Sequence, residues 1–374
     1  MSVLILIILL SVLIFVHELG HFIVAKKNGI RVDEFAIGFP PTIFSKKKGG
    51  TKYSLNLIPF GGFVKIFGEN IDEESLDPSS KDSFLNKSPL AQGAVLVAGV
   101  GFNIIFAWIL ISISFMAGFP SVVSESNISQ IENSNVVISN LFKGSPADIA
   151  GLQSGDKIIK IENNGVVLEK TQTQNIIIHD IQSLVAQSSG EISVTIGRGG
   201  DNISNFKEIL EFSIKPKQGI VDKEVVAIGI SMENVGQMKL GFFKAIGRGF
   251  IMTCQLLKDI ASGLVKLISG TISGNGSLSN VAGPVGIISL VGDAANFGFF
   301  YFLSFAAYIS LNLAVLNILP LPALDGGRLL ILIIESISHK KIKPKIVNAI
   351  NGIGFLVLII LMIAITINDV LRLF

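Results

Sequence analysis

Long apolar stretches of the chain alternate with segments that carry most of its charged residues. Residues 1–25 contain one formally charged side chain, that of Glu18, and no charged residue occurs within 88–124, 294–324 or 346–368. Each stretch can form a helix of ~20 residues, enough to cross ~30 Å of hydrocarbon at ~1.5 Å per residue. The pattern predicts four transmembrane helices, near residues 2–25, 94–117, 297–319 and 350–368.

A secretory signal peptide is the alternative interpretation of the first stretch. Such a peptide needs basic residues at its start and a small-residue cleavage site at its end. Residues 1–25 have neither feature, so we expect them to remain a membrane span.

Residues 120–240 follow a different pattern. Short β-type runs at 135–138, 157–161, 192–196 and 225–230 alternate with turn signals rich in Asn and Gly. This pattern is typical of a small β-rich domain, which we place at 126–232. Beyond it, 240–268 carries Lys and Arg at helical spacing among apolar residues, which predicts an amphipathic helix on the membrane surface. The Gly- and Ser-rich residues 269–280 are expected to form a flexible loop.

Composition supports a membrane protein and excludes other classes. Only 16% of residues are charged, against ~25% in soluble domains, and 49% are hydrophobic. A wholly soluble or disordered chain is therefore excluded. The net charge of +2 is too small and scattered for nucleic-acid binding, and the single cysteine excludes an internal disulfide. The predicted fold is a polytopic α-helical membrane protein with about four transmembrane helices and one inserted β-rich domain, in contact with the lipid bilayer.

The distribution of Lys and Arg predicts the orientation in the membrane. These residues are concentrated in 26–92 and in 339–349, whereas the C-terminal tail has only Arg372. Since basic loops stay in the cytoplasm, both segments are expected inside. Both termini and the domain within 120–240 are then expected outside.

The one charge inside the first apolar stretch belongs to a metal-binding pattern. His17 and His21 are four positions apart, so a helix places both on one face, within reach of one Zn²⁺. Glu18 lies beside them and can act as a general base for a metal-activated water. A structural polar cluster between helices is the alternative interpretation of these three side chains.

Zinc in a catalytic site needs a third protein ligand, and Asp325 is the best candidate. It is the first charge after the third span, in a segment where Pro320, Pro322, Gly326 and Gly327 interrupt the helical pattern. Irregular backbone at membrane depth is tolerated where it lines a wet cavity, although an ordinary turn between helices is the alternative. By helical rise, His17 lies toward the inner side, where the third span also ends.

At these residues the chain resembles the site-2 protease family of intramembrane zinc metalloproteases, in particular the bacterial regulator of sigma-E protease type. The resemblance covers nearly the whole chain and rests on four pieces in the family's order. They are His17-Glu18-x-x-His21, a hairpin-like segment at 53–65, a PDZ-like signature at 144–158, and Asn317-x-x-Pro320-x-Pro322-x-Leu324-Asp325-Gly326. The resemblance implies that His17, His21 and Asp325 bind one zinc ion, that Glu18 is the catalytic base, and that Asn317, Pro320 and Pro322 engage the substrate.

Two departures from the family concern substrate access. Many relatives carry two PDZ domains, and 120–240 has room for one. The second span lacks the family's Pro before Asn103. Asn103 is expected to face the site and bind substrate, with a helix-packing amide as the alternative. The segments 1–119 and 297–374 are expected to hold the first and last pairs of spans.

The predicted function is hydrolysis of peptide bonds within the transmembrane segments of single-span membrane proteins. Anti-sigma factors or remnant signal peptides are the substrates that the resemblance implies, in a bacterial inner membrane. An unwound substrate could add as a strand beside 53–65, where Tyr53, Leu55 and Leu57 alternate, or that hairpin could merely plug the cavity. The PDZ-like domain is expected to bind a peptide or chain terminus, or only to screen the site.

Two other functions use the same residues. A catalytically silent membrane scaffold could recruit partners through its PDZ-like domain, but it would need neither a metal nor Glu18. A metal transporter could use the same ligands, but the chain offers no second ligand set for onward transfer.

Overall fold

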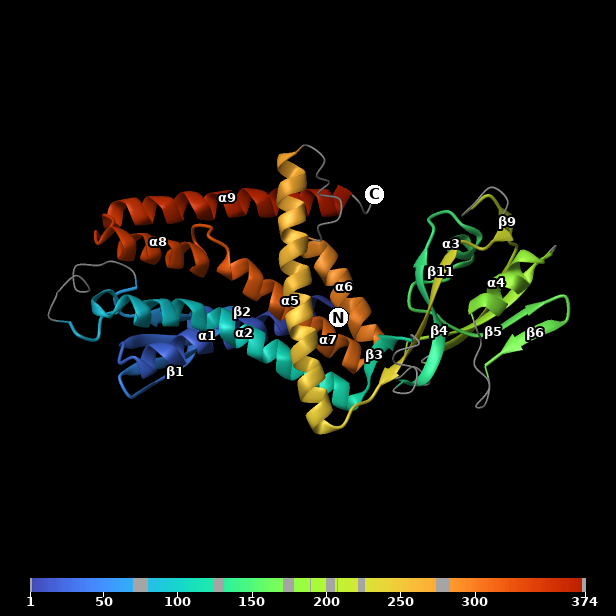
Figure 1. The fold of residues 1–374 in the computed structure, drawn as a ribbon, viewed down its shortest axis with the longest axis horizontal. Coiled ribbons are helices and arrows are strands. Elements are labelled where there is room, and N and C mark those ends of the chain that lie inside the picture. The colour runs from blue at the N-terminus through green and yellow to red at the C-terminus, as the bar shows by residue number, and fades with distance from the viewer. Residues whose placement is uncertain are drawn as a thin grey trace. The chain divides into compact units, whose positions relative to one another are not determined.

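The computed structural model describes residues 2–69, 80–123, 131–170, 178–188, 190–199, 206, 208–220, 226–273 and 283–371. The chain divides into two compact units. The first, here the helical unit, contains residues 1–111, 249–292 and 305–374, and the second, here the sheet unit, contains 112–248 and 293–304. Figure 1 shows the elements of both units.

Four helices confirm the predicted apolar stretches. The segments Ser2–Lys27, Pro89–Ala117, Phe299–Ile318 and Ile346–Leu371 are long and apolar enough to cross a membrane. They are α1, α2, α7 and most of α9 (Pro344–Leu371). The other described helices of this unit are α5 (Phe242–Ile272), α6 (Pro284–Phe297), α8 (Asp325–Ser338) and the short 3-10 helix η1 (Phe84–Asn86). Helices α2, α5, α6 and α7 continue from one unit into the other.

Local sequence explains how α1 and α2 begin, end and pack together. Helix α1 ends before Gly29, whose positive φ of 64° suits glycine. Helix α2 begins after Ser88, whose Oγ accepts a hydrogen bond from the Ala91 amide at 3.4 Å. Where the two helices meet, a Cβ on Gly20 would lie 2.5 Å from the Ala98 carbonyl oxygen. Glycine at position 20 therefore lets the two backbones approach closely.

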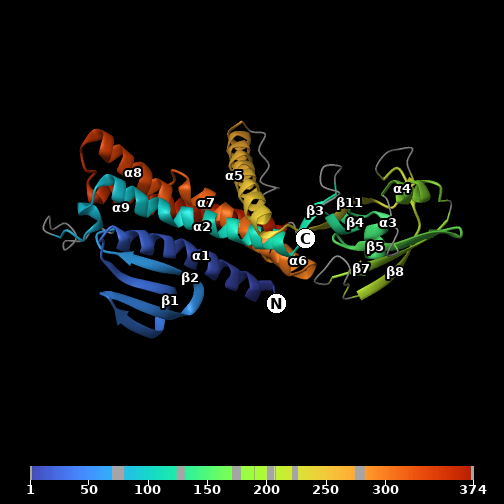
Figure 2. The same ribbon diagram turned by 60° about the horizontal axis from the view of Figure 1, so that its bottom comes forward.

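The strands β1 (Val32–Lys48) and β2 (Thr51–Ile66) form a bent hairpin alongside α1 (Figures 1 and 2). Gly49 and Gly50, both with positive φ, form its two-residue turn. The first half of β1 pairs with both ends of β2, so Phe35 opposes Tyr53 on one side and Val64 on the other. The hairpin is thus folded over into what is in effect a four-stranded layer, with 62–66 at one edge.

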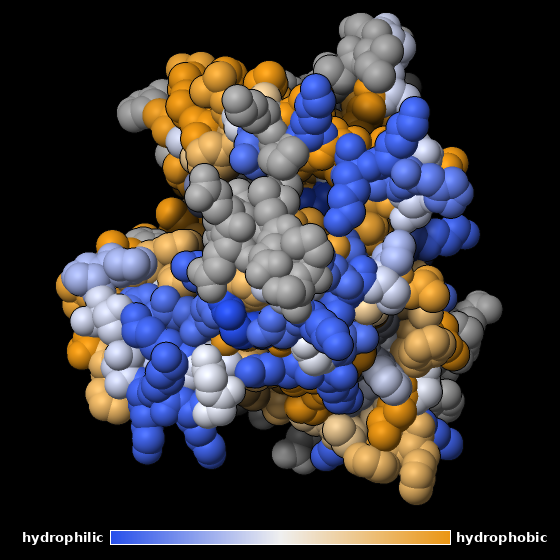
Figure 3. Space-filling view, turned by 90° about the vertical axis from the view of Figure 1, so that its left-hand side faces the viewer, coloured by the Kyte–Doolittle hydropathy of each residue, from blue (hydrophilic) through white to orange (hydrophobic). Residues whose placement is uncertain are grey.

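One end of the helical unit is strongly hydrophilic. Figure 3 views the end at which α2 begins and α8 leads into α9, and hydrophilic residues cover much of this face. Exposed lysines in the α8–α9 connection include Lys340, Lys341 and Lys343. An apolar core lies behind this end, where α1, the hairpin and α2 meet around Ala25, Ile30, Val32, Ile66, Phe84, Val95 and Leu96.

The sheet unit is built on a seven-stranded antiparallel sheet. Its strand order is β3-β11-β4-β5-β7-β8, with β6 paired to β5. The bounds are β3 Phe119–Val122, β4 Ile131–Leu141, β5 Lys157–Asn163, β6 Val166–Glu169, β7 Ile192–Arg198, β8 Glu208–Ile214 and β11 Ile230–Met238. The small strands β9 (Lys217–Gln218) and β10 (Val226–Ala227) pair with each other. Helices α3 (Pro146–Ala150) and α4 (Ile178–Ala186) complete the unit, and Ile138, Ile158, Ile161 and Ile181 are in its core.

The turn-rich signature at 144–158 has the expected local structure. Ser145 caps α3 through its side chain, Pro146 occupies the first turn, and Gly151 ends the helix with a φ of 95°. Strand β5 follows, with Ile158 buried in the core. These residues therefore shape a tight helical turn that leads directly into a central strand.

Several predicted elements differ from the structure. The predicted strand at 225–230 is split, because Gly229 has a φ of 84° and separates β10 from β11. The segment 53–65 is one arm of the hairpin rather than the whole of it. Residues 269–272 of the predicted loop belong to α5, and 274–280 lie outside the described residues. The pattern also did not predict α4, α6 or α8 as separate helices.

Candidate metal centre and active site

Helix α1 presents two imidazoles one helical turn apart. The Nε2 atoms of His17 and His21 are 3.1 Å apart, and each residue is 8% exposed. Their rings meet edge to face with centroids 4.7 Å apart. The spacing of four residues thus has the predicted effect: both ring nitrogens point to the same place on one side of the helix.

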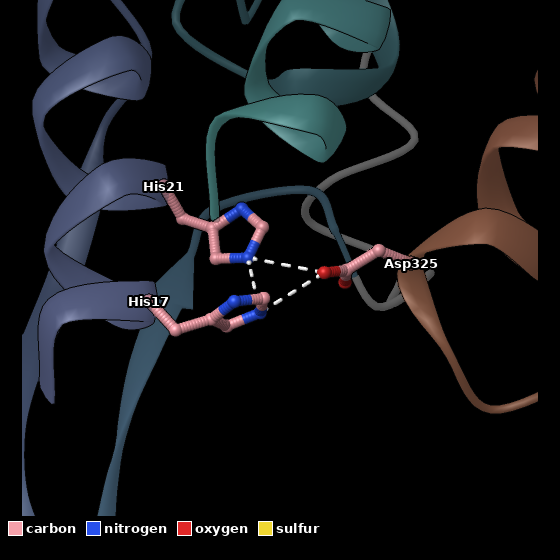
Figure 4. A group of neighbouring side chains, drawn as sticks. All are labelled: His17, His21 and Asp325. Carbon is pink, nitrogen blue, oxygen red and sulfur yellow. Dashed lines mark hydrogen bonds and ion pairs between the residues drawn. The ribbon is translucent and has the colours of Figure 1, made fainter. Parts of the chain in front are cut away.

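Asp325 arrives at the same place from the other end of the chain (Figure 4). Its Oδ2 lies 3.0 Å from Nε2 of His17 and 3.4 Å from Nε2 of His21. Asp325 is the first residue of α8, which follows the non-helical residues 319–324. A Cβ on Gly326 would lie 2.2 Å from the Ile318 carbonyl oxygen. The absence of that Cβ lets α8 begin tightly against the end of α7, which brings Asp325 to the histidines.

These three donors fit a zinc ion. Two imidazole nitrogens and one carboxylate oxygen form a set that catalytic zinc sites use, and tetrahedral zinc with ligand bonds of ~2.0–2.2 Å needs ligand atoms about 3.3 Å apart. The observed separations of 3.0, 3.1 and 3.4 Å match the three edges of one such tetrahedral face. Three protein ligands leave the fourth position of a tetrahedron for water or substrate, as in catalytic rather than structural zinc sites.

A cavity of about 400 Å³ adjoins the three donors. Glu18 lines it, and one of its carboxylate oxygens accepts a hydrogen bond from the Val64 amide at 3.1 Å. The edge of the hairpin at 63–66 forms another wall. The cavity therefore brings together a ligand set, an acid–base group and one edge of the hairpin.

An ion pair that the sequence did not predict also lines this cavity. Arg328, one helical turn after Asp325, pairs with Glu69, which follows β2. The same two residues line a smaller neighbouring cavity of about 100 Å³. The pair therefore separates the two cavities.

Helix α2 supports the ligands from behind. A Cβ on Gly99 would lie 2.3 Å from Nε2 of His21 and 2.8 Å from Nε2 of His17. Nδ1 of His21 lies 2.8 Å from the Val95 carbonyl oxygen. Nδ1 of His17 lies 3.3 Å from Nδ2 of the Asn103 side chain. The sequence pattern did not single out Gly99, because the contact joins two distant parts of the chain.

The structure does not gather every predicted site residue at the cavity. Among the described residues, its lining includes neither Asn317, Pro320, Pro322 nor Asn103. Pro320 is exposed. Pro322 packs against Gly354 of α9, where an added Cβ would lie 2.3 Å from the Cβ of Pro322. Contact of Asn317, Pro320 and Pro322 with substrate stays a prediction.

The predicted edge at Tyr53, Leu55 and Leu57 is wrong for the first two residues. Tyr53 pairs with both Phe35 and Lys46, and Leu55 with both Ile37 and Phe44. Because β1 folds back on both sides of this segment, 53–55 lies inside the layer. The edge nearest the metal donors is 63–66.

Comparison with known proteins identifies relatives over nearly the whole chain. The profile of peptidase family M50 matches residues 5–361. A protein named as a candidate zinc metalloprotease from Clostridium perfringens is 36% identical over 96% of both chains. A similarly named protein from Clostridium acetobutylicum is 34% identical over 99% of this chain and 97% of its own. Protease RseP of Yersinia pestis is 30% identical over 98% of each chain, in an alignment of 460 positions that includes inserted residues.

Proposed function

Because the chain belongs to peptidase family M50, we propose that it is a zinc metalloprotease that cleaves single-span membrane proteins within their transmembrane segments. The observation that carries this proposal is the convergence of His17, His21 and Asp325 at zinc-ligand spacing. Two of these ligands lie on a helix that is long and apolar enough to cross a membrane. Ionisable groups in such a helix are costly, so they mark functional sites.

The chemistry follows from the residues around the cavity. Zinc, when bound by His17, His21 and Asp325, supplies a Lewis acid for the attacking water and the scissile carbonyl. Glu18 lines the same cavity and can accept a proton from that water, then deliver it to the leaving amine. The Val64 amide, which donates to Glu18 at 3.1 Å, orients this carboxylate.

The hairpin edge at 63–66 is the proposed site of the unwound substrate. A substrate helix hides its carbonyls in its own hydrogen bonds, and strand addition would replace those bonds after unwinding. Residues 62–66 pair with β1, and 63–66 of these also line the cavity. This arrangement supports strand addition over a hairpin that only plugs the cavity.

The sheet unit offers a second proposed contact, for a peptide or chain terminus. A groove of about 430 Å³ lies between α4 and the strands β10 and β11, with Val185, Ile228 and Met232 among its lining residues. Strand β3 covers only Val235–Met238 of β11. Ile230 and Met232 of β11 lie outside this pairing and line the groove, so this part of β11 is proposed as an edge to which an extended peptide can add.

The proposed location is a bacterial inner membrane, with the sheet unit and both termini outside and the metal centre toward the cytoplasm. The lysines in the α8–α9 connection and on either side of the β1–β2 turn support this orientation, because basic connections stay in the cytoplasm. Anti-sigma factors and remnant signal peptides remain the proposed substrates.

The test compares wild type with Glu18→Gln on a single-span substrate in detergent. Wild type should bind one zinc ion and cleave the substrate. Glu18→Gln should bind zinc equally well and cleave ~10²–10⁴-fold more slowly, because it lacks the general base. Asp325→Asn serves as the matched control, since it should lose the metal.

Three results would count against the proposal. A zinc-free wild type would contradict the proposed metal centre. Undiminished cleavage by Glu18→Gln would contradict the proposed role of Glu18 as general base. Zinc binding without any cleavage in wild type would favour the scaffold function.

A further inference from the structure

We propose that Asn103 is a positioning residue that holds His17 in the tautomer able to bind zinc, rather than a residue that binds substrate. This inference rests on the proposed metal centre and adds a role for α2 to it. Three observations carry it: the contacts of the two histidines, the burial of Asn103, and the orientation of its amide.

The first observation is a difference between the two histidines. Each must bind zinc through Nε2, the atom that faces Asp325. A neutral imidazole has one N–H, so Nδ1 must carry it and needs an acceptor. For His21 that acceptor is the Val95 carbonyl oxygen, 2.8 Å from Nδ1. A carbonyl can only accept, so the tautomer of His21 is set by the backbone of α2.

The Nδ1 atom of His17 has a side chain as its partner, whereas that of His21 has a backbone carbonyl. The partner of the His17 Nδ1 is the Asn103 carboxamide, whose Nδ2 lies 3.3 Å away. In this orientation the amide donates to Nδ1, which puts the histidine proton on Nε2, the atom needed for zinc. If the amide turns over, Oδ1 takes that place and accepts the proton of Nδ1–H.

The surroundings of Asn103 permit this turn. Its Oδ1 is buried and has no hydrogen-bond partner among the described residues, so turning breaks only the bond to His17 and forms another there. The backbone is meanwhile held in place, because Ser310 of α7 donates a hydrogen bond from Oγ to the Asn103 carbonyl oxygen at 2.9 Å. Neither orientation of the amide therefore displaces a neighbouring hydrogen-bond partner, and the one that presents Oδ1 to His17 is the one compatible with zinc binding.

Burial argues against direct contact with substrate. Asn103 is 0% exposed, and the described lining of the catalytic cavity does not include it. It lies one helical turn after Gly99, the residue whose missing side chain makes room for both imidazoles. The helix thus supplies space at position 99, an acceptor at Val95 and a second acceptor at Asn103.

The experiment measures zinc affinity by chelator competition on the full chain in detergent. Asn103→Leu removes the acceptor at similar volume and should weaken zinc binding ~10–100-fold, the usual cost of losing a partner of a metal-binding histidine. Asn103→Asp keeps an oxygen acceptor and should bind zinc within a few-fold of wild type. Thr253→Val, the control, removes a buried hydrogen bond within α5, from Oγ1 to the Gly249 carbonyl oxygen, and should leave affinity unchanged. Thermal unfolding of each metal-free form monitors folding, and Asn103→Ala replaces the Leu variant if that variant does not fold.

Two outcomes would overturn the inference. Unchanged zinc affinity in Asn103→Leu with a raised KM would make Asn103 a substrate-binding residue. Equal loss of affinity in Asn103→Leu and Asn103→Asp would make it a packing amide. A wild type that binds no zinc would instead contradict the proposed function, so the two failures are distinguishable.

Discussion

Both units bury ionisable side chains, but these side chains have different kinds of partner in the two units. In the sheet unit, Asp156 is 1% exposed and accepts hydrogen bonds from Arg198 at 2.7 and 2.8 Å and from the Gln153 amide at 2.8 Å. In the helical unit, His17, His21 and Asp325 direct their donor atoms at one another. Among the described residues, no lysine or arginine forms an ion pair with Asp325.

This difference separates a structural charge from a functional one. A buried carboxylate that is fully paired within the chain needs nothing else, and its partner holds the fold together. Three lone pairs that converge on one point repel one another unless a cation lies between them. Asp156 is therefore satisfied by partners within the chain, whereas the metal centre requires a cation.

The largest expected effect concerns the space for the metal ligands. Gly99→Ala should abolish zinc binding and cleavage, because the new Cβ would lie 2.3 Å from Nε2 of His21 and displace the ligands themselves. Gly101→Ala is the matched control on the same helix, since its Cβ would meet nothing within 4 Å. Zinc content and chelator competition provide the measurement. Wild-type zinc affinity in Gly99→Ala would contradict the packing described for α2.

The next effect tests the pairing inside the sheet unit. Asp156→Asn should lower the free energy of unfolding of this unit by about 3–5 kcal/mol, because it leaves the Arg198 guanidinium without its charged partner. Zinc affinity should not change. Glu162→Gln in the half-exposed pair with Lys160 should cost less than ~1 kcal/mol. Pulse proteolysis in urea, with fragments assigned to the sheet unit, measures both. Equal losses of unfolding free energy in the two variants would show that burial of the Asp156–Arg198 pair does not increase its contribution to stability.

A smaller effect should appear as a pH dependence in the free energy of unfolding of the sheet unit alone. Burial, with a contribution from Lys170, lowers the pKa of Lys157 from 10.5 to about 8. Between these values the unfolded chain holds a proton that the folded chain has lost, so stability should rise as pH increases through this window. The rise should be about 3 kcal/mol, because each pKa unit between about 8 and 10.5 is worth about 1.4 kcal/mol.

Lys157→Met should remove this rise, whereas Lys160→Met, at a half-buried position of the same strand, should keep it. Pulse proteolysis of both variants from pH 7 to pH 10.5 provides the measurement. A wild type whose stability falls across this window would show that Lys157 stays charged when folded.

Local patterns were sufficient to predict much of the fold and part of the site. The four apolar helices follow from stretches without charge, and the convergence of His17 and His21 follows from helical periodicity. Asp325 could be chosen because it is the first charge after an interrupted helix. The bent hairpin could not be predicted, because its double pairing of β1 joins residues up to 34 positions apart. The Glu69–Arg328 pair escaped notice for the same reason, since its members are 259 positions apart.

The sequence by itself determined that two histidines and a glutamate occupy one apolar helix, and that an aspartate could join them. Those properties depend on the period of a helix and the cost of charge in hydrocarbon, which act over a few residues. Only the tertiary structure decided which atoms face the ligands: Gly99, the Val95 carbonyl and Asn103 on α2, and the edge 63–66 of the hairpin. Such contacts depend on how two backbones pack in space, and no periodicity along a single chain segment specifies that.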